Sequence, residues 1–278
     1  MPVYDLHCHS TCSDGSLSVS ELVLRACEQN VDVLAITDHD CVDGLAEASR
    51  LIEHDNLPIE LVNGVEISCR WHSFEIHIVG LNIDPSAEPL KALLSEQQQR
   101  RYNRFDAMLK KLYQRGVSLS AEECQAEGLP TRKHIADAMV RKGIVSNPQK
   151  AFDRFIGKGN SAYVNPEWCD IPTAIEAIHE AGGKAVLAHP HGYKMSNKWL
   201  RKLLIQGKEW GLDAMEVSLC QQSPGHRDAL AKMSQEYGLL ASQGSDFHYP
   251  GNWRELGKNL CLPADCVPIW EHWSQYQD

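Results

Sequence analysis

The first strand-and-helix unit of the chain reads VYDLHCHSTCSDGSLSVSELVLRA over residues 3–26. It begins with the apolar and β-branched run 3–6, which predicts a short buried strand. Ser18 and Glu21 then form a capping-box pattern directly before an apolar run that starts at Leu22, and this predicts the first turn of a helix. A strand followed at once by a helix is the repeating unit of an α/β fold with parallel strands.

The same unit recurs along the chain. Further strands are predicted at 33–37, 59–65, 75–81, 184–188, 213–217 and 239–242, and helices at about 172–182, 197–210 and 224–237. This alternation predicts parallel strands joined by right-handed crossovers. Seven strands suit a barrel better than a small open sheet, so we expect an α/β barrel. We expect its tail, residues 249–278 with Trp253, Trp270 and Trp273, to close the bottom or an edge.

Residues 91–158 interrupt this alternation. One helical pattern runs from Leu90 to a stop at Gly116, and a second begins at Thr131 and ends at Gly143. We therefore expect a barrel built from 1–90 and 161–278, with a small helical insertion at 91–160 that covers the substrate. Residues 91–158 hold 14 Lys and Arg but only 7 Asp and Glu, in a chain whose net charge is -10. This asymmetry indicates an anionic ligand, the alternative being a solvated helix face.

The composition is that of an ordinary globular protein. Hydrophobic residues make up 43% of the 278 residues and charged residues 23%. The sequence has no apolar run near the roughly 20 residues that a membrane span needs, and its start lacks signal-peptide features. We therefore expect a cytoplasmic protein that binds neither membranes nor long duplex DNA. The ten Cys form no C-x-x-C pair, which favours reduced, packed thiols over a zinc ribbon.

Imidazole and carboxylate side chains follow or lie within the predicted strands. In a parallel barrel the C-terminal strand ends meet on one face, so these groups are expected at one rim. His7 and His9 are two residues apart in an extended segment and therefore point to the same side, and Asp246 and His248 repeat this spacing. Such groups bind zinc, manganese or iron. The candidate ligands are His7, His9, Asp14, His39, Glu66, His77, His189, Asp246 and His248.

Nine ligands exceed the needs of one tetrahedral site, so we predict two or three metal ions, with Glu66 as a bridging carboxylate. A lone histidine is more often a surface or core residue, and this applies to His54, His179, His226 and His272. His72 and His191 lie near proposed ligands and could line the pocket. The assignment of His77 depends on the rest of the set.

Several motifs resemble those of the PHP (polymerase and histidinol phosphatase) superfamily. They are Asp5-Leu6-His7-Cys8-His9-Ser10 with Ser13-Asp14-Gly15, Ile36-Thr37-Asp38-His39-Asp40, Gly64-Val65-Glu66-Ile67-Ser68, Glu75-Ile76-His77-Ile78-Val79-Gly80, Ala188-His189-Pro190 and Gly244-Ser245-Asp246-Phe247-His248. The resemblance covers essentially the whole chain, in order. Within the superfamily, the length and the insertion resemble the TrpH and ribonuclease AM group, which includes nucleoside 3',5'-bisphosphate phosphatases. Lys133 and His191 depart from that group's usual residues.

The resemblance implies a distorted (β/α)7 TIM-like barrel with a trinuclear metal centre. His7, His9, Glu66 and Asp246 would hold one ion, Asp14, His39 and His248 a second, and Glu66, His77 and His189 a third. Manganese is the implied ion for this group, with zinc or iron as alternatives.

The implied chemistry is phosphate-ester hydrolysis, in which a metal-bound hydroxide attacks a phosphate that bridges the metals. We expect the enzyme to convert nucleoside 3',5'-bisphosphates to the 5'-monophosphate and phosphate, and to trim short RNA from 5' to 3'. Arg132 and His134 could hold a second phosphate, such as the 3'-phosphate, with Lys158 and Arg101 as further substrate contacts. Either His191 or His134 could protonate the leaving oxygen.

Three other functions are consistent with parts of the sequence. A histidinol-phosphate-type phosphomonoesterase would use the same metal site without needing the basic insertion. An amidohydrolase would usually need a lysine bridge between metals, and no lysine ends a predicted strand in the right order. A non-catalytic metal-binding regulatory module would be expected to have lost some ligands, whereas this set is intact.

Overall fold

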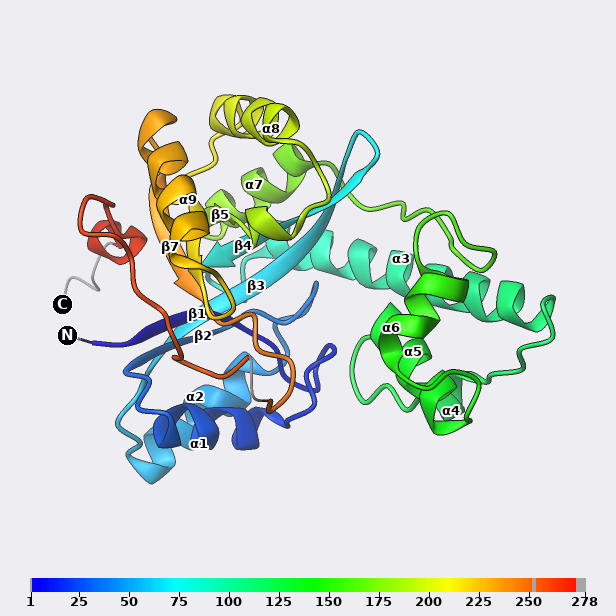
Figure 1. The fold of residues 1–278 in the computed structure, drawn as a ribbon. Helices are drawn as coiled ribbons and strands as arrows, with labels where there is room; N and C mark the ends of the chain where they lie inside the picture. Colours follow the sequence, from blue (N-terminus) through cyan, green and yellow to red (C-terminus); the bar gives the residue numbers. More distant parts are fainter. Residues whose placement is uncertain (1, 252–253, 274–278) are drawn as a thin grey trace.

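All seven predicted strands form, and they lie in chain order within one sheet that curves into a nearly closed barrel (Figure 1). The computed structural model describes residues 2–251 and 254–273. The strands are β1 (Tyr4–Cys8), β2 (Val33–Ile36), β3 (Glu60–Trp71), β4 (Phe74–Leu81), β5 (Lys184–Leu187), β6 (Ala214–Leu219) and β7 (Leu240–Gly244). The predicted α/β barrel is thus confirmed.

The first and last strands meet just beyond their carboxyl ends. The Asp246 N–H donates to the His7 carbonyl at 2.8 Å, and the His9 N–H donates to the Phe247 carbonyl at 2.9 Å. These bonds close the barrel at the rim where the candidate ligands of β1 and β7 emerge. Backbone pairing therefore fixes the His7–His9 segment against the Asp246–His248 segment.

The prediction of parallel strands throughout is wrong for β4, which runs antiparallel to both β3 and β5. Only His72 and Ser73 separate β3 from β4, and His72 adopts a positive φ of 51°. A parallel crossover needs a dozen or more residues, so this connection can only form a hairpin. β3 accordingly continues to Trp71, well past its predicted end at Val65. The reversal pairs His77 of β4 with Ser68 of β3 near the rim.

Successive side chains of each strand point alternately to the inside and the outside of the barrel, which separates an inner core from an outer one. Val33 and Ala35 belong to the inner cluster, whereas Leu34 and Ile36 pack outward with α1 (Val19–Glu28) and residues of α2 (Leu45–Asp55). The capping box of α1 forms as predicted, with Ser18 and Glu21 each accepting the other's backbone N–H. Helices α7 (Ile171–Glu180), α8 (Asn197–Glu209) and α9 (Pro224–Glu236) cover the other outer face, close to their predicted ranges.

The C-terminal tail closes the end of the barrel opposite the rim. Ile269 is fully buried in the inner cluster, within a short 3-10 helix, Ile269–His272. Trp270 stacks on Tyr4 with ring centroids 4.1 Å apart, and Trp273 packs on the same cluster. The tail therefore plays the expected role, although Trp253 lies outside the described residues.

The insertion is helical, as predicted. It contains α3 (Glu88–Tyr113), α4 (Ala121–Cys124), α5 (Arg132–Arg141) and α6 (Pro148–Ala151), which continues into a π-helical turn, Phe152–Ile156. The far part of α3 packs with these short helices beside the barrel (Figure 1). Phe105, Met108, Ile135 and Met139 lie in an apolar cluster separate from the barrel's clusters. Within the described ranges, none of the helices has both the length and the apolar character of a bilayer span.

Candidate metal centre

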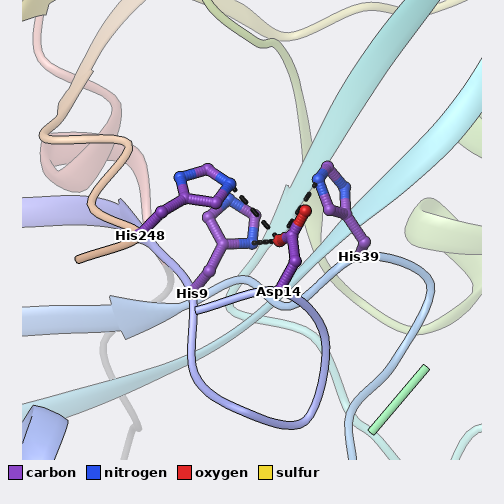
Figure 2. A group of neighbouring side chains, drawn as sticks. All are labelled: His9, Asp14, His39 and His248. Carbon is purple, nitrogen blue, oxygen red and sulfur yellow. Dashed lines mark ion pairs between the residues drawn. The ribbon is translucent and has the colours of Figure 1, made fainter. Parts of the chain in front are cut away.

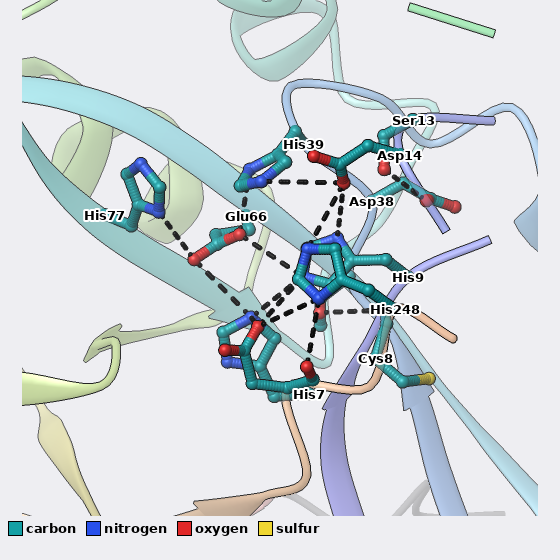
Figure 3. A network of polar contacts seen from close by, with 12 residues as sticks. His7, Cys8, His9, Ser13, Asp14, Asp38, His39, Glu66, His77 and His248 are labelled. Atoms are coloured by element: carbon teal, nitrogen blue, oxygen red, sulfur yellow. Dashed lines mark hydrogen bonds and ion pairs between the residues drawn. The ribbon is translucent and has the colours of Figure 1, made fainter. Parts of the chain in front are cut away.

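Eight candidate ligands gather around the ninth, Glu66, whose carboxylate lies at the middle of the rim (Figure 3). Its Oε1 lies 2.8 Å from His77 Nδ1, 3.0 Å from His189 Nε2 and 3.4 Å from His7 Nε2. Its Oε2 lies 2.8 Å from His39 Nδ1 and 3.4 Å from His9 Nε2. Five imidazoles from β1, β4 and the loops after β1, β2 and β5 therefore converge on one carboxylate. The hairpin reversal is what places His77 in this group.

Two further carboxylates lie on the β1 and β7 side of the cluster. Asp14 Oδ1 lies 3.3 Å from His248 Nε2, 3.8 Å from His39 Nε2 and 4.0 Å from His9 Nδ1 (Figure 2). Asp246 Oδ1 lies 3.5 to 3.7 Å from a nitrogen of each of His248, His9 and His7.

Three groups of these atoms are compact enough to hold an ion, because the ligand atoms within each lie within 4.8 Å of one another. They are His9, Asp14, His39 and His248; His7, His9 and Glu66; and His39, Glu66 and His77. The resemblance implied similar sets, but it left His9 out of the first group, added Asp246 to the second and placed His189 where the third group has His39. His189 and Asp246 lie at the edge of the cluster.

Four buried polar atoms of the cluster have no hydrogen-bond partner among the described residues. They are His9 Nδ1, Asp14 Oδ1, His39 Nδ1 and Glu66 Oε2. His39 Nδ1 and Glu66 Oε2 are only 2.8 Å apart, yet they are not aligned as a hydrogen bond. Unsatisfied buried polar groups are costly and rare, so four at one point need a common partner. Imidazole and carboxylate atoms converging in this way fit a divalent cation.

Electrostatics favours the protonation state that metal coordination requires at Glu66 and at His9, but not at His248. Burial alone would raise the pKa of Glu66, but His39 and His77 outweigh it and hold that pKa well below its usual range. Burial, with the positive charge of His248, lowers the pKa of His9 to about 3. Glu66 is therefore ionised and His9 neutral at neutral pH, which leaves both able to bind a metal ion. At His248 the carboxylates of Asp14 and Asp246 outweigh burial and raise the pKa to about 9, so a bound cation would have to displace that proton.

A second layer of carboxylates positions the cluster. Glu216, in the middle of β6, accepts a hydrogen bond from His7 Nδ1 at 2.7 Å and another from the His189 backbone N–H. The first bond directs His7 Nε2 toward Glu66. Glu216 was not among the predicted site residues, although its place in a predicted strand next to the rim was a usable signal.

Asp38 holds the loop that carries Asp14. It accepts hydrogen bonds from the Ser10 N–H at 2.8 Å and from the hydroxyls of Ser10 and Ser13, each at 2.6 Å. Burial raises the pKa of Asp38 to about 6, against the lowering effect of these donors. Asp38 thus has a positioning role in the loop and stands outside the ligand groups.

A cavity of about 140 Å³ lies between the cluster and the insertion. Asp14, His39 and His77 form one side of this first cavity, and Arg104, Arg132 and the rings of Phe152 and Trp168 form the other. It joins the proposed metal site to the basic part of the chain, and it offers guanidinium groups for an anion and rings for a base.

Glu75 organises the cations of the first cavity. Arg104 binds both of its carboxylate oxygens, at 3.0 and 3.2 Å, and Arg132 approaches them at 3.4 and 3.5 Å. Burial would raise the pKa of Glu75, but Arg132 and Arg104 lower it to about 2. Glu75 was not a predicted site residue. The signal for Glu75 was its position two residues before His77, which puts both on one face of the strand.

The residues predicted to contact the substrate differ in whether they line a cavity. Arg132 and Arg101 line the first cavity, but Arg101 also makes a buried ion pair with Asp40 at 2.6 Å. The Nδ1 of His134 accepts the Thr131 N–H at 3.0 Å at the start of α5, and His134 itself lines neither cavity, although its neighbours Lys133 and Ile135 line the first. Lys158 donates to the Ser73 carbonyl at the hairpin turn and lines neither this cavity nor the second one.

A second cavity, of about 200 Å³, opens on the other side of the cluster. Its lining includes His189 and Asp246 from the cluster, together with His191, Tyr193, Gln221 and Arg254. The two predicted proton donors therefore lie apart, His191 in the second cavity and His134 beside the first.

Comparison with known proteins identifies the family of this chain. A model of the PHP domain matches residues 5–237. A 5'-3' exoribonuclease from Haemophilus influenzae is 48% identical over 270 residues, which cover 96% of this chain and 98% of that protein. A 3',5'-nucleoside bisphosphate phosphatase from Chromobacterium violaceum is 35% identical over 271 residues, covering 96% and 94%.

Among solved structures, an amidohydrolase from Chromobacterium violaceum with bound sulfate and no metal matches with a TM-score of 0.91 and 34% identity. The match covers 97% of this chain and 95% of that one. The sequence motifs, the barrel and these matches lead to one assignment: the chain belongs to the PHP domain family.

Proposed function

We propose that this protein is a metal-dependent phosphoesterase. It hydrolyses nucleoside 3',5'-bisphosphates to the 5'-monophosphate and phosphate, and it trims short RNA from the 5' end. The observation that carries the proposal is the convergence of four unsatisfied buried ligand atoms beside a cavity lined by arginines. The relatives named as a 5'-3' exoribonuclease and a 3',5'-nucleoside bisphosphate phosphatase support it. Such substrates suit a cytoplasmic enzyme.

The nine clustered side chains would hold the divalent ions, which we propose to be three manganese ions per chain, with zinc or iron as alternatives. His9, Asp14, His39 and His248 would hold one ion, and Glu66 would be shared by the other two. Bound divalent ions would neutralise the phosphate oxygens and lower the pKa of water. Glu216 keeps the Nε2 of His7 directed at the cluster, as histidine ligands generally require from their outer partners.

The proposed products indicate which phosphate of the substrate lies at the metal cluster and which lies in the first cavity. Release of a 5'-monophosphate means that the bond between phosphorus and O3' breaks, so the 3'-phosphate lies at the metal cluster. The second phosphate is then the 5'-phosphate, rather than the 3'-phosphate that the sequence suggested. Arg132 and Arg104 would bind it in the first cavity, since a guanidinium has five donors and can share them between Glu75 and a phosphate. Trp168 or Phe152 would stack on the base.

The same assignment places His134, rather than His191, on the side of the leaving oxygen. O3' belongs to the nucleoside in the first cavity, and His134 lies on that side, whereas His191 lines the second cavity. Because Nδ1 of His134 accepts the Thr131 N–H and burial lowers the pKa of His134, the ring is neutral and carries its proton on Nε2. It would therefore hydrogen-bond O3', and the proton that O3' takes up would come from water. We propose that the insertion, residues 91–160, covers the bound nucleotide, with Lys158 holding it to the hairpin at Ser73.

One experiment tests this function. The protein is stripped with chelator and incubated with adenosine 3',5'-bisphosphate, histidinol phosphate or a short 5'-phosphorylated RNA, with and without manganese. We expect manganese-dependent release of 5'-AMP from the first and third substrates. Turnover of histidinol phosphate alone would show that the substrate assignment is wrong. Equal activity before and after chelation would exclude the proposed metal chemistry.

A further inference from the structure

We infer that the second cavity binds the part of an RNA substrate that lies downstream of the phosphate being cut. This inference rests on the proposed function and adds a binding site to it. The cavity is the one lined by His189, His191, Tyr193, Gln221, Asp246 and Arg254.

The argument begins with the two substrates. Adenosine 3',5'-bisphosphate (pAp) and the trinucleotide pApApA share the same first nucleoside, the same 5'-phosphate and the same bond between phosphorus and O3'. They differ only in what else the scissile phosphate carries. In pAp its other oxygens are free, whereas in pApApA one of them is esterified to the next nucleoside. A site that cuts both must therefore offer space beside the cluster, in a direction away from the first nucleoside.

The structure has open space on two sides of the cluster. The first cavity reaches it at Asp14, His39 and His77, and the second reaches it at His189 and Asp246. No lining residue is common to both cavities. The first nucleoside and its 5'-phosphate are assigned to the first cavity because the paired arginines and the rings lie there. The second cavity then remains for the substituent on the scissile phosphate.

The lining of the second cavity suits a sugar-phosphate backbone. Arg254 Nη1 donates to the carboxylate and the carbonyl of Asp246, each at 2.8 Å. Its Nη2 and Nε have no hydrogen-bond partner among the described residues, and its side chain is 33% exposed. Gln221 and His191 are also exposed and polar. Arginine, glutamine and histidine donors bind phosphate and ribose oxygens without reading the base.

The aromatic group of this cavity is already engaged. The Tyr193 hydroxyl accepts the His77 N–H at 2.9 Å, and its ring packs on His189 with centroids 5.3 Å apart. Among the described residues, the lining of the second cavity contains no Trp or Phe, whereas Trp168 and Phe152 line the first cavity, with Arg104 and Arg132 lying over their rings. The downstream nucleotide is therefore held through its backbone, and its base identity has little effect on binding.

The reaction balances with this placement. Water adds its oxygen to phosphorus, the bond between phosphorus and O3' breaks, and O3' takes up a proton. From pApApA the products are 5'-AMP, leaving the first cavity, and pApA, whose new 5'-phosphate was the scissile one. From pAp the products are 5'-AMP and inorganic phosphate.

The test compares the two substrates in one variant. Gln221→Glu places a carboxylate in the second cavity, where it would repel the next phosphate of pApApA. We expect the ratio of kcat/KM for pAp to kcat/KM for pApApA to rise at least fivefold. Gln29→Glu makes the same charge change at an exposed site after α1, at the end of the barrel opposite the rim, and should keep the wild-type ratio. Arg254→Ala, checked for unchanged manganese content, should raise the ratio in the same direction.

Each outcome bears on a different claim. A raised ratio in Gln221→Glu and Arg254→Ala, with the wild-type ratio in Gln29→Glu, supports the downstream site. An unchanged ratio in both cavity variants overturns it, as does wild-type protein that hydrolyses pAp but not pApApA. Wild-type protein that hydrolyses neither substrate overturns the proposed function, and the downstream site with it.

Discussion

Glu216 offers a sharp test of the metal site because it touches two candidate ligands without being one of the clustered nine. It is 1% exposed, and its two oxygens accept hydrogen bonds from His7 Nδ1 and from the His189 backbone N–H. In Glu216→Gln, the amide oxygen can still accept from His7, but the amide nitrogen then faces the N–H of His189. Two donors would meet in a buried place, and the negative charge behind His7 would be lost.

The size of the effect follows from the hydrogen bond to the His189 N–H, which the substitution removes. Losing one hydrogen bond to a charged group costs about 1.5–3 kcal/mol, which is roughly 10- to 150-fold in an equilibrium constant. Substitution of the outer partners of metal ligands typically costs about 10- to 100-fold in metal affinity or activity. We therefore expect Glu216→Gln to weaken manganese binding by about 10- to 100-fold while the fold is retained.

Isothermal titration calorimetry with manganese measures this change, and kcat/KM for adenosine 3',5'-bisphosphate is measured at low and at saturating manganese. Activity should fall most at low manganese and recover in part when manganese is raised. Glu180→Gln, at an exposed position at the end of α7, is the matched control and should behave as wild type. Wild-type affinity in Glu216→Gln would refute the reasoning that Glu216 positions metal ligands.

Three more substitutions test other parts of the site. Glu75→Gln should lower the free energy of unfolding by up to about 3 kcal/mol at pH 7, because the folded-state pKa of Glu75 is about 2 against an ordinary 4.5. That difference from wild type should shrink as the pH falls from 4.5 toward 2, and urea unfolding at pH 7 and pH 3 checks this sign. Arg132→Ala should raise KM for adenosine 3',5'-bisphosphate by roughly 10-fold or more with unchanged metal content, and unaltered kinetics would remove Arg132 from the substrate site. Asp14→Ala should lower the manganese stoichiometry measured by mass spectrometry, whereas a full complement would contradict its role as a ligand.

Local patterns in the sequence predict much of this protein. Apolar periodicity and capping residues depend on a few neighbouring positions, and they predicted all seven strands, the capping box at Ser18 and the helical insertion. The nine clustered side chains could also be predicted, because each occupies or follows a strand and barrel geometry brings those places together. The reversal of β4 was missed because the run 59–65 was ended too early, before the short hairpin at His72 became apparent.

The remaining features depend on side chains that meet across long stretches of chain. Glu75 pairs with Arg104 and Arg132, and Glu216 pairs with His7. These partners are so far apart in the sequence that no repeating pattern of residues predicts their contact. The two cavities are likewise volumes left between elements. Periodicity shows which face of an element is buried, but it does not show which partner covers that face. Local patterns therefore specify the strands, the helices and the kinds of candidate ligand, whereas the direction of β4, the arginine–glutamate network and the two-sided access to the cluster depend on long-range packing.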